Sequence, residues 1–309
     1  MKLHGIHHVT AITARARDNH RFYTHHLGLR LVKKTVNQDD VSAYHLFYAD
    51  GAGTPGTDLT FFDWPAAPER RGTCSMARTG LRVGDLASLE WWRERLGNQA
   101  IIAERDGRPV LDFEDPEGQR LSLVVDDEPA TAVWQRSPVP AEHQIRGLGP
   151  LHLSVPKLEP TDRVFRELLN MQSVRSYASE GRDVIVYQMN DQPGCARELH
   201  LAVEPHLPAA RQGAGGVHHL ALRTSNADYD AWARRLAESG RPNSGPVDRF
   251  WFRSLYFREP GGILIEIATD EPGFATDEPL DKLGETLSLP PFLEPRRREI
   301  EAGLTPLDT

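Results

Sequence analysis

The fold is most clearly indicated by residues 217–270, which open with VHHLAL (217–222) and close with GGILIEIAT (261–269) followed by Asp270. Apolar and polar residues alternate in both segments, a pattern typical of strands that bury one face. Between them, residues 226–238 have the spacing of an amphipathic helix. The stretch therefore predicts a module in which one strand is followed by a helix and further strands.

The same order of segments recurs four times along the chain. The opening strands are expected at 6–12, 80–84, 151–155 and 218–222, and the helices at 19–27, 86–96, 161–169 and 226–238. The closing strands read DLTFFD, RLSLVV, ELHLAV and LIEIAT. We therefore predict an α+β fold of four βαβββ modules that form two cupped mixed-sheet pseudo-barrels.

The domain organisation follows from these modules and from a proline-rich linker over residues 126–150. We predict an N-terminal pair of modules over residues 1–140 and a C-terminal pair over residues 141–275. Residues 276–309 are expected to form a tail with a short helix near 296–302.

Strand alternation separates the side chains of each strand between two faces. Ile265 and Ile267 are expected to pack on the module's helix, so Glu266 points into the concave face of the sheet. The same reasoning directs His219 and His8 into the concavity and their neighbours away from it. Because an unpaired carboxylate is costly to bury, Glu266 is interpreted as a metal ligand.

The pairing of modules decides the chemistry. If the first and last modules share a cup, its inward positions are His8, Thr60, His219 and Glu266. Two imidazoles and one carboxylate leave coordination positions for substrate and O₂ on Fe(II). If the last two modules share it, the positions are His152, His200, His219 and Glu266, and four ligands suit an isomerase better. We favour the first pairing, which leaves His152 and His200 in a weak second cup beside Gly80 and Ser122.

Longer motifs carry a family resemblance. GIHHVTAIT, FYTHHLGLRLVKKTVNQDD, GVHHLAL and DRFWFRSLYFREPGGILIEIATDEPGF resemble the vicinal oxygen chelate superfamily. Within it they are similar to ring-cleaving dioxygenases that open para-hydroquinones, of the dichlorohydroquinone 1,2-dioxygenase type. The resemblance implies iron ligands from the first and last modules, namely His8, His219 and Glu266. It also implies roles beside the metal for His7, Thr10, His218, Arg249 and Tyr256.

The residue chemistry is consistent with that function. A permanently charged guanidinium such as Arg249 suits an ionised substrate oxygen, and Tyr256 could donate a hydrogen bond to it. His7 and His218 could move protons, because imidazoles titrate near neutral pH. The expected cofactor is Fe(II), with Mn or Zn as substitutes, and the expected partners are a small aromatic substrate and O₂. The oligomeric state is left open, although homo-oligomers are common in this fold.

The composition disfavours other classes. A net charge of −8 speaks against nucleic-acid binding, and no stretch has the roughly 20 apolar residues that span a bilayer. With two cysteines and no signal-peptide pattern, we expect a cytoplasmic protein. The remaining alternatives are a catechol extradiol dioxygenase, a glyoxalase-like metal-dependent isomerase or lyase, and a binding protein of the bleomycin-resistance kind.

Overall fold

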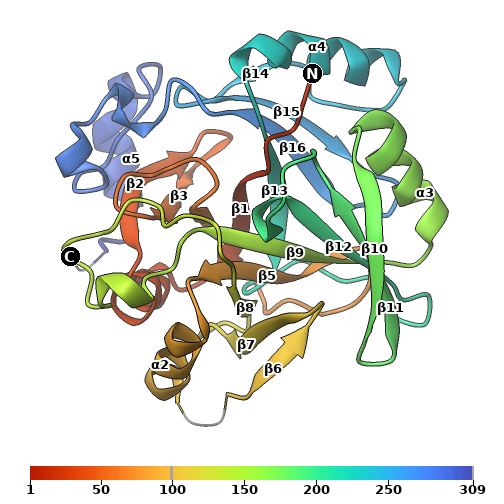
Figure 1. Cartoon of the computed structure of the whole chain (residues 1–309). Coiled ribbons are helices and arrows are strands. Elements are labelled where there is room, and N and C mark those ends of the chain that lie inside the picture. Colours follow the sequence, from red (N-terminus) through yellow and green to blue (C-terminus); the bar gives the residue numbers. More distant parts are fainter. Residues whose placement is uncertain (98–99, 308–309) are drawn as a thin grey trace.

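The computed structural model describes residues 1–97 and 100–307, and its strands form two curled mixed sheets (Figure 1). The first sheet has the order β14 (Val247–Asp248), β15 (Arg253–Arg258), β16 (Leu264–Thr269), β13 (Val217–Thr224), β1 (Ile6–Thr13), β4 (Asp58–Asp63), β3 (Asp40–Ala49) and β2 (Arg30–Asn37). The second has the order β10 (Gln172–Ser179), β11 (Arg182–Gln188), β12 (Glu198–Val203), β9 (Leu148–Val155), β5 (Ser75–Val83), β8 (Arg120–Val125), β7 (Arg108–Glu114) and β6 (Ile102–Arg105).

The first and last modules share one sheet. β1 pairs in parallel with β4 of its own module and antiparallel with β13 of the last module. The second sheet joins the two middle modules through the antiparallel pair β5 and β9. The predicted α+β fold and the favoured pairing of modules are therefore confirmed.

Most predicted elements have the expected bounds. The four closing strands, α2 (Leu86–Leu96) and α4 (Asn226–Glu238) lie where the sequence places them. The first and third helices begin earlier, as α1 (Ala16–Arg21) and α3 (Leu158–Arg163), and each continues into a π-helical turn. Asn19 and Thr161, the predicted first residues, are instead buried inside these helices.

Helix α4 covers the sheet beside the strands of the last module, at the top of Figure 1. Ser225 caps its N-terminus, where the side-chain oxygen accepts a hydrogen bond from the backbone N–H of Asp228 at 3.2 Å. Tyr229, Trp232 and Leu236 are the buried residues of the helix. Their spacing of three and four residues places them on one face of the helix. Packing of this face against the sheet supports β13 and β16, the strands that bear His219 and Glu266.

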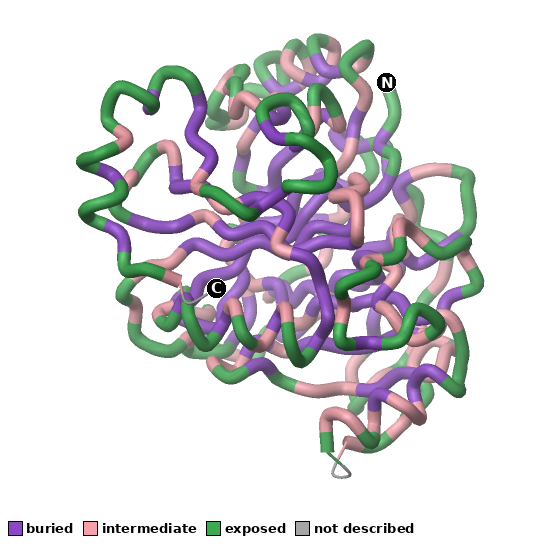
Figure 2. The backbone as a smooth tube through the Cα atoms, turned by 90° about the vertical axis from the view of Figure 1, so that its left-hand side faces the viewer, coloured by how far each residue is buried: buried purple, intermediate pink, exposed green. Residues whose placement is uncertain are grey.

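One apolar core extends through both sheets. Val9, Leu220 and Ile265 belong to it and are completely buried. Figure 2 shows buried segments at the centre of the molecule and exposed ones in the outer loops and helices. The side chains that alternate with Leu220 and Ile265 therefore face the concave side of the sheet.

The C-terminal tail lies against the first module. It ends in helix α5 (Arg297–Gly303), close to the predicted position, and Leu287 forms a bridge with Lys34 of β2. In the part of the chain that the structure describes, no helix is long and apolar enough to cross a membrane. The predicted domain boundaries at residues 140 and 275 stay a prediction, and the last two residues of the tail lie outside the described range.

Candidate metal centre and aromatic pocket

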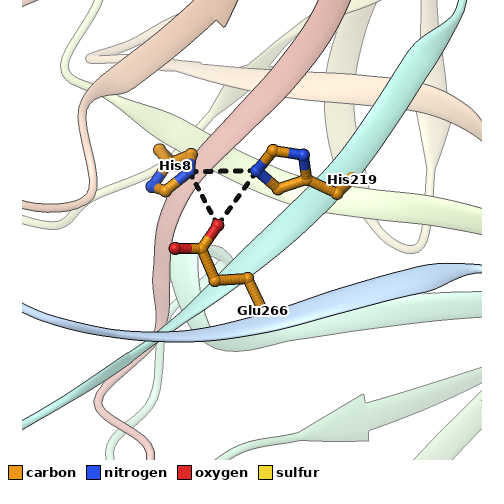
Figure 3. Close-up of side chains that lie close together, drawn as sticks. All are labelled: His8, His219 and Glu266. Atoms are coloured by element: carbon orange, nitrogen blue, oxygen red, sulfur yellow. Dashed lines mark hydrogen bonds and ion pairs between the residues drawn. The ribbon is translucent and has the colours of Figure 1, made fainter. Parts of the chain in front are cut away.

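Three side chains from three neighbouring strands meet on the concave face of the first sheet. The Nε2 atoms of His8 and His219 are 3.3 Å apart. Oε2 of Glu266 lies 3.2 Å from the first and 2.9 Å from the second. All three residues are buried, with exposed fractions of 1%, 4% and 0%. Figure 3 shows their polar atoms pointing at one common position.

Strand pairing produces this convergence. β13 and β16 run parallel, with Ala221 opposite Glu266, and β1 lies on the other side of β13. Leu220 and Ile265 are fully buried on the helix side, so His219 and Glu266 project from the opposite face. The ligand positions predicted from alternation are thus the ones that the fold brings together.

The donor set fits a divalent cation. Burial alone would raise the pKa of the Glu266 carboxyl, but the imidazoles of His8 and His219 outweigh it and hold the pKa well below its usual range. Burial lowers the pKa of His219, which favours a neutral imidazole with a lone pair. Within the described part of the chain, Oε2 of Glu266 is buried without a hydrogen bond of good geometry, although Ser254 donates one to Oε1 at 2.5 Å.

The separations also suit a small ion. Ligand atoms about 2.1 Å from a metal and at right angles to each other would be about 3.0 Å apart. The three observed separations, from 2.9 to 3.3 Å, lie close to this value. A chelating cation would therefore satisfy three buried polar atoms at once.

His7 and His218 each contact the adjacent candidate ligand. The Nδ1 atoms of His7 and His8 are 2.8 Å apart, and so are those of His218 and His219. The sequence predicts that both residues point away from the centre, but β1 has a bulge next to His7, and bulges redirect side chains. Burial lowers the pKa of both His7 and His218 to about 3, so each can accept a hydrogen bond from its neighbour.

The triad opens into a cavity of about 410 Å³. Its wall is mainly aromatic, and the ring-bearing side chains other than the candidate ligands are His45, Phe47, Phe62, Trp64, His218, Trp251, Phe252 and Tyr256. The turn between β2 and β3, residues 37–40, closes part of the rim. A planar apolar molecule of modest size suits such a space.

Arg249 and Tyr256 form one unit in this wall. Nε of Arg249 donates a hydrogen bond to the Tyr256 hydroxyl at 3.2 Å, and its terminal nitrogen donates to Asp39 at 2.9 Å. The side chain of Gln38 donates to the carbonyl of Arg249 at 2.9 Å. Burial raises the pKa of the Tyr256 phenol above its usual value. The tyrosine is therefore a neutral donor beside a fixed positive charge.

Thr10 also reaches the centre, with its hydroxyl 3.1 Å from Nε2 of His219 and 2.7 Å from the Thr60 hydroxyl. His45 bonds Thr60 from the other side at 2.9 Å, and sequence reasoning missed it. In strand register, Phe47 faces Thr60 as Tyr256 faces Glu266, so extending the module comparison to the third strand would have pointed to this wall.

Trp251 and Phe252 line the cavity as well, although the sequence pattern gives no indication that they belong to the site. Both are nearly buried, with exposed fractions of 2% and 5%. A buried aromatic residue in the core and one in a deep pocket have the same local pattern, so the sequence carries no signal that separates them.

The second cup is filled by ion pairs. His152 and His200 face each other across β9 and β12, as the repeat predicts. Nε2 of His200 lies 3.2 Å from Glu198, whose carboxylate also accepts from Arg175 at 2.8 Å. Arg175 pairs with Asp106 too, so a guanidinium already supplies the positive charge that these acids need.

Comparison with known proteins gives consistent matches. Residues 147–267 match the family described as the glyoxalase/bleomycin resistance protein/dioxygenase superfamily. MhqA of Bacillus subtilis, named as a candidate ring-cleaving dioxygenase, is 47% identical over 315 residues, covering 99% of this chain and all of that protein. A chlorohydroquinone/hydroquinone 1,2-dioxygenase of Sphingobium indicum is 30% identical over 97% of this chain and 95% of its own length.

Comparison with solved structures gives matches to the same group of proteins. A Bacillus subtilis protein described as a candidate dioxygenase has a TM-score of 0.91 at 35% identity, covering 99% of this chain and 98% of its own. Glyoxalase I of Zea mays has a TM-score of 0.60 at 16% identity, covering 86% of this chain and 92% of its own. At that identity the second match reports on the fold alone.

Proposed function

Because this chain belongs to the glyoxalase/bleomycin resistance protein/dioxygenase superfamily and is a ring-cleaving dioxygenase, we propose that it opens a para-hydroquinone with O₂ at a non-haem Fe(II). His8, His219 and Glu266 would hold the metal. The observation that carries the proposal is a triad of two imidazoles and one carboxylate opening into an aromatic cavity. Such a triad is typical of Fe(II) oxygenases.

When bound, the iron would supply the electron transfer that lets O₂ react with an aromatic ring. The protein's own residues orient the substrate. Trp251, Phe252 and Phe62 offer flat apolar surfaces against which a ring can pack. They also displace water, which strengthens the electrostatic interactions of every polar group in the cavity.

Tyr256 and Arg249 would hold an ionised substrate oxygen. Because the Tyr256 oxygen accepts a hydrogen bond from Arg249, its own hydrogen remains available for a substrate. The nearby guanidinium makes that hydrogen a better donor and offsets negative charge on the substrate. Asp39 holds the arginine in place from the rim. These contacts favour a phenolate over a neutral phenol.

The two alternative enzyme classes would require different features in the site. A glyoxalase-like isomerase would require a fourth protein ligand, but the corresponding residue is Thr60, whose hydroxyl is bonded to Thr10 and His45. A catechol extradiol enzyme would present a site for two adjacent hydroxyls. The name of the Sphingobium relative favours hydroquinone. The cytoplasmic location and homo-oligomeric assembly stay predictions.

Oxygen uptake by the protein reconstituted anaerobically with Fe(II) tests the proposal. We expect consumption of O₂ in step with loss of a para-hydroquinone, and weaker uptake with catechols. Mn(II) and Zn(II) should bind the same ligands, with Zn(II) giving no uptake. Uptake with catechols alone would favour the catechol enzyme, and an iron-loaded protein without uptake on either class would eliminate the dioxygenase proposal.

His8→Ala and His152→Ala form a matched pair, because the two histidines hold corresponding positions in the first and third modules. Iron binding and uptake should be lost in His8→Ala and kept in His152→Ala. The opposite result would place the metal outside the proposed triad.

A further inference from the structure

A continuous chain of polar atoms connects the candidate metal centre with the wall of the substrate cavity. Nε2 of His219 lies 3.1 Å from the Thr10 hydroxyl, which lies 2.7 Å from the Thr60 hydroxyl, which lies 2.9 Å from Nε2 of His45. Both threonines are completely buried. His45 is partly exposed and lines the cavity. This series of polar atoms therefore begins at the candidate metal centre and ends where a substrate or water can reach it.

Each hydroxyl in this series donates once, and three contacts need three hydrogens, so at least one imidazole must donate through Nε2. If only His45 donates, every hydrogen bond points towards His219, which keeps a lone pair on Nε2 and donates through Nδ1 to His218. If only His219 donates, every hydrogen bond points towards His45, and His218 donates to Nδ1 of His219 instead. Moving one hydrogen in each contact converts one arrangement into the other, which is the behaviour of a proton relay.

A cation at the triad would free the Thr10 end of this hydrogen-bonded series. Nε2 of His219 would then use its lone pair for the metal and could no longer bond Thr10. The Thr10 hydroxyl would instead face whatever group occupies the open side of the triad. This step rests on the proposed function, in which a substrate hydroxyl binds there.

The symmetry of the modules supports a special role for His45. In register, His45 and Thr60 of the first module correspond to Ser254 and Glu266 of the last. In the last module a small hydroxyl supports a ligand carboxylate. In the first module the sizes are reversed, and a titratable imidazole supports a small hydroxyl. The position that could have held a fourth ligand thus became part of a hydrogen-bonded chain.

We propose that Thr10, Thr60 and His45 conduct a proton between the substrate hydroxyl and the cavity. The O–H bond of the substrate breaks as Thr10 takes its proton, and the electron pair stays on the phenolate oxygen. Thr10 passes its own proton to Thr60, and Thr60 passes its proton to Nε2 of His45. Nδ1 of His45 then releases a proton to the cavity, and the reverse sequence returns one to the product.

His45 is in the right state to receive a proton. Burial lowers its pKa well below the usual value, and the neighbouring His8, His219 and Arg249 contribute while Glu266 opposes them. The imidazole is therefore neutral. Among residues 1–97 and 100–307, Nδ1 of His45 has no hydrogen-bond partner, so this nitrogen can exchange its hydrogen with the cavity.

Nitrogen NMR of the protein loaded with Zn(II), which has no redox chemistry, tests the relay without turnover. On addition of hydroquinone under anaerobic conditions, the Nε2 resonance of His45 should shift between its N–H and lone-pair positions. Thr60→Val keeps the shape of the side chain but removes the hydroxyl, so the shift should disappear. Thr79→Val is the control, because Thr79 is buried in the second sheet and its hydroxyl has no hydrogen-bond partner among the described residues. This variant should respond as the wild type does.

The outcomes separate the two proposals. A shift that persists in Thr60→Val, or Zn(II) binding without any shift, would overturn the relay alone. A wild-type protein that binds no Zn(II) would refute the metal centre and the relay with it.

Turnover by the iron-loaded enzyme gives a second measurement. In His45→Gln the amide can still bond Thr60 but cannot pass a proton between two nitrogens. His45→Gln and Thr60→Val should each lower kcat about 100-fold with KM unchanged, a typical contribution of positioned proton transfer. Their double variant should be no slower than either, because both interrupt one path. Losses that multiply in the double variant would contradict a single relay.

Discussion

Lys33→Met tests how the C-terminal tail holds the wall of the pocket. Lys33 is fully buried in β2, and its ammonium group donates to Asp277 at 2.9 Å, to the Phe274 carbonyl at 3.1 Å and to Glu278. Asp277 also accepts a hydrogen bond from the indole of Trp251 at 2.8 Å. One buried cation therefore joins a strand of the first module, the tail and a side chain that lines the cavity.

Methionine has a similar length without the charge, so two carboxylates lose their partner. Removing one member of a buried ion pair costs about 3–5 kcal/mol. The melting temperature should fall by about 6–10 °C, since each kcal/mol shifts it by roughly 2 °C in a long chain. Lys33→Met combined with Asp277→Asn and Glu278→Gln also removes the two unpaired negative charges. This triple variant should recover most of the lost stability.

The loss of stability caused by Lys33→Met should depend on pH. Burial would raise the pKa of Asp277, but hydrogen bonds from Ser288, Lys33 and Trp251 outweigh it and lower the pKa. A carboxylate with a depressed pKa stabilises the fold above its unfolded pKa of about 3.9, and this contribution disappears as the pH falls through the folded value. The difference between wild type and Lys33→Met should be complete at pH 7 and shrink below about pH 4.

Urea unfolding followed by tryptophan fluorescence, at neutral and at acid pH, measures these differences. Limited proteolysis should cut the tail of Lys33→Met before the body of the protein. A single variant as stable as the wild type, or a triple variant less stable than the single one, would refute the reasoning.

Three further variants test the site and the fold. Tyr256→Phe should lower kcat about 10–100-fold at nearly constant KM, because a hydrogen bond to a charged group contributes about 1.5–3 kcal/mol; steady-state O₂ uptake measures it, and an unchanged kcat would remove Tyr256 from the mechanism. Glu266→Gln should weaken Zn(II) binding at least about tenfold in calorimetry, since a neutral amide cannot offset the charge of a cation; undiminished affinity would exclude Glu266 as a ligand. Ser225→Ala should lower the unfolding free energy by about 1 kcal/mol in urea, because the backbone N–H of Asp228 loses its acceptor, while Ser225→Asp should retain the cap.

Local pattern was sufficient for the strands and for much of the site. The alternation around Leu220 and Ile265 places His219 and Glu266 on the concave face, and comparison of the modules adds His8. Features that depend on distant contacts left no such signal. The partners of Lys33 are more than 240 residues away, so the tail could not be placed. The bulge that turns His7 towards His8 depends on pairing with β13, which alternation within one strand does not specify.

Because of the position of β1, the candidate site forms only when the first and last modules are both folded and paired. It lies between β4 of its own module and β13 of the last one, so His8 reaches His219 only after the final module has joined the first. Pairing of strands so distant in sequence requires a large loop to close, which is slow. Within the described residues, the triad leaves a buried carboxylate oxygen without a hydrogen bond of good geometry. A cation that binds only the paired arrangement stabilises that arrangement over all others. Metal binding should therefore strengthen the junction between the first and last modules more than the second sheet. Hydrogen exchange would detect this as greater protection in β1 and β13 than in β5 and β9 when Zn(II) is added.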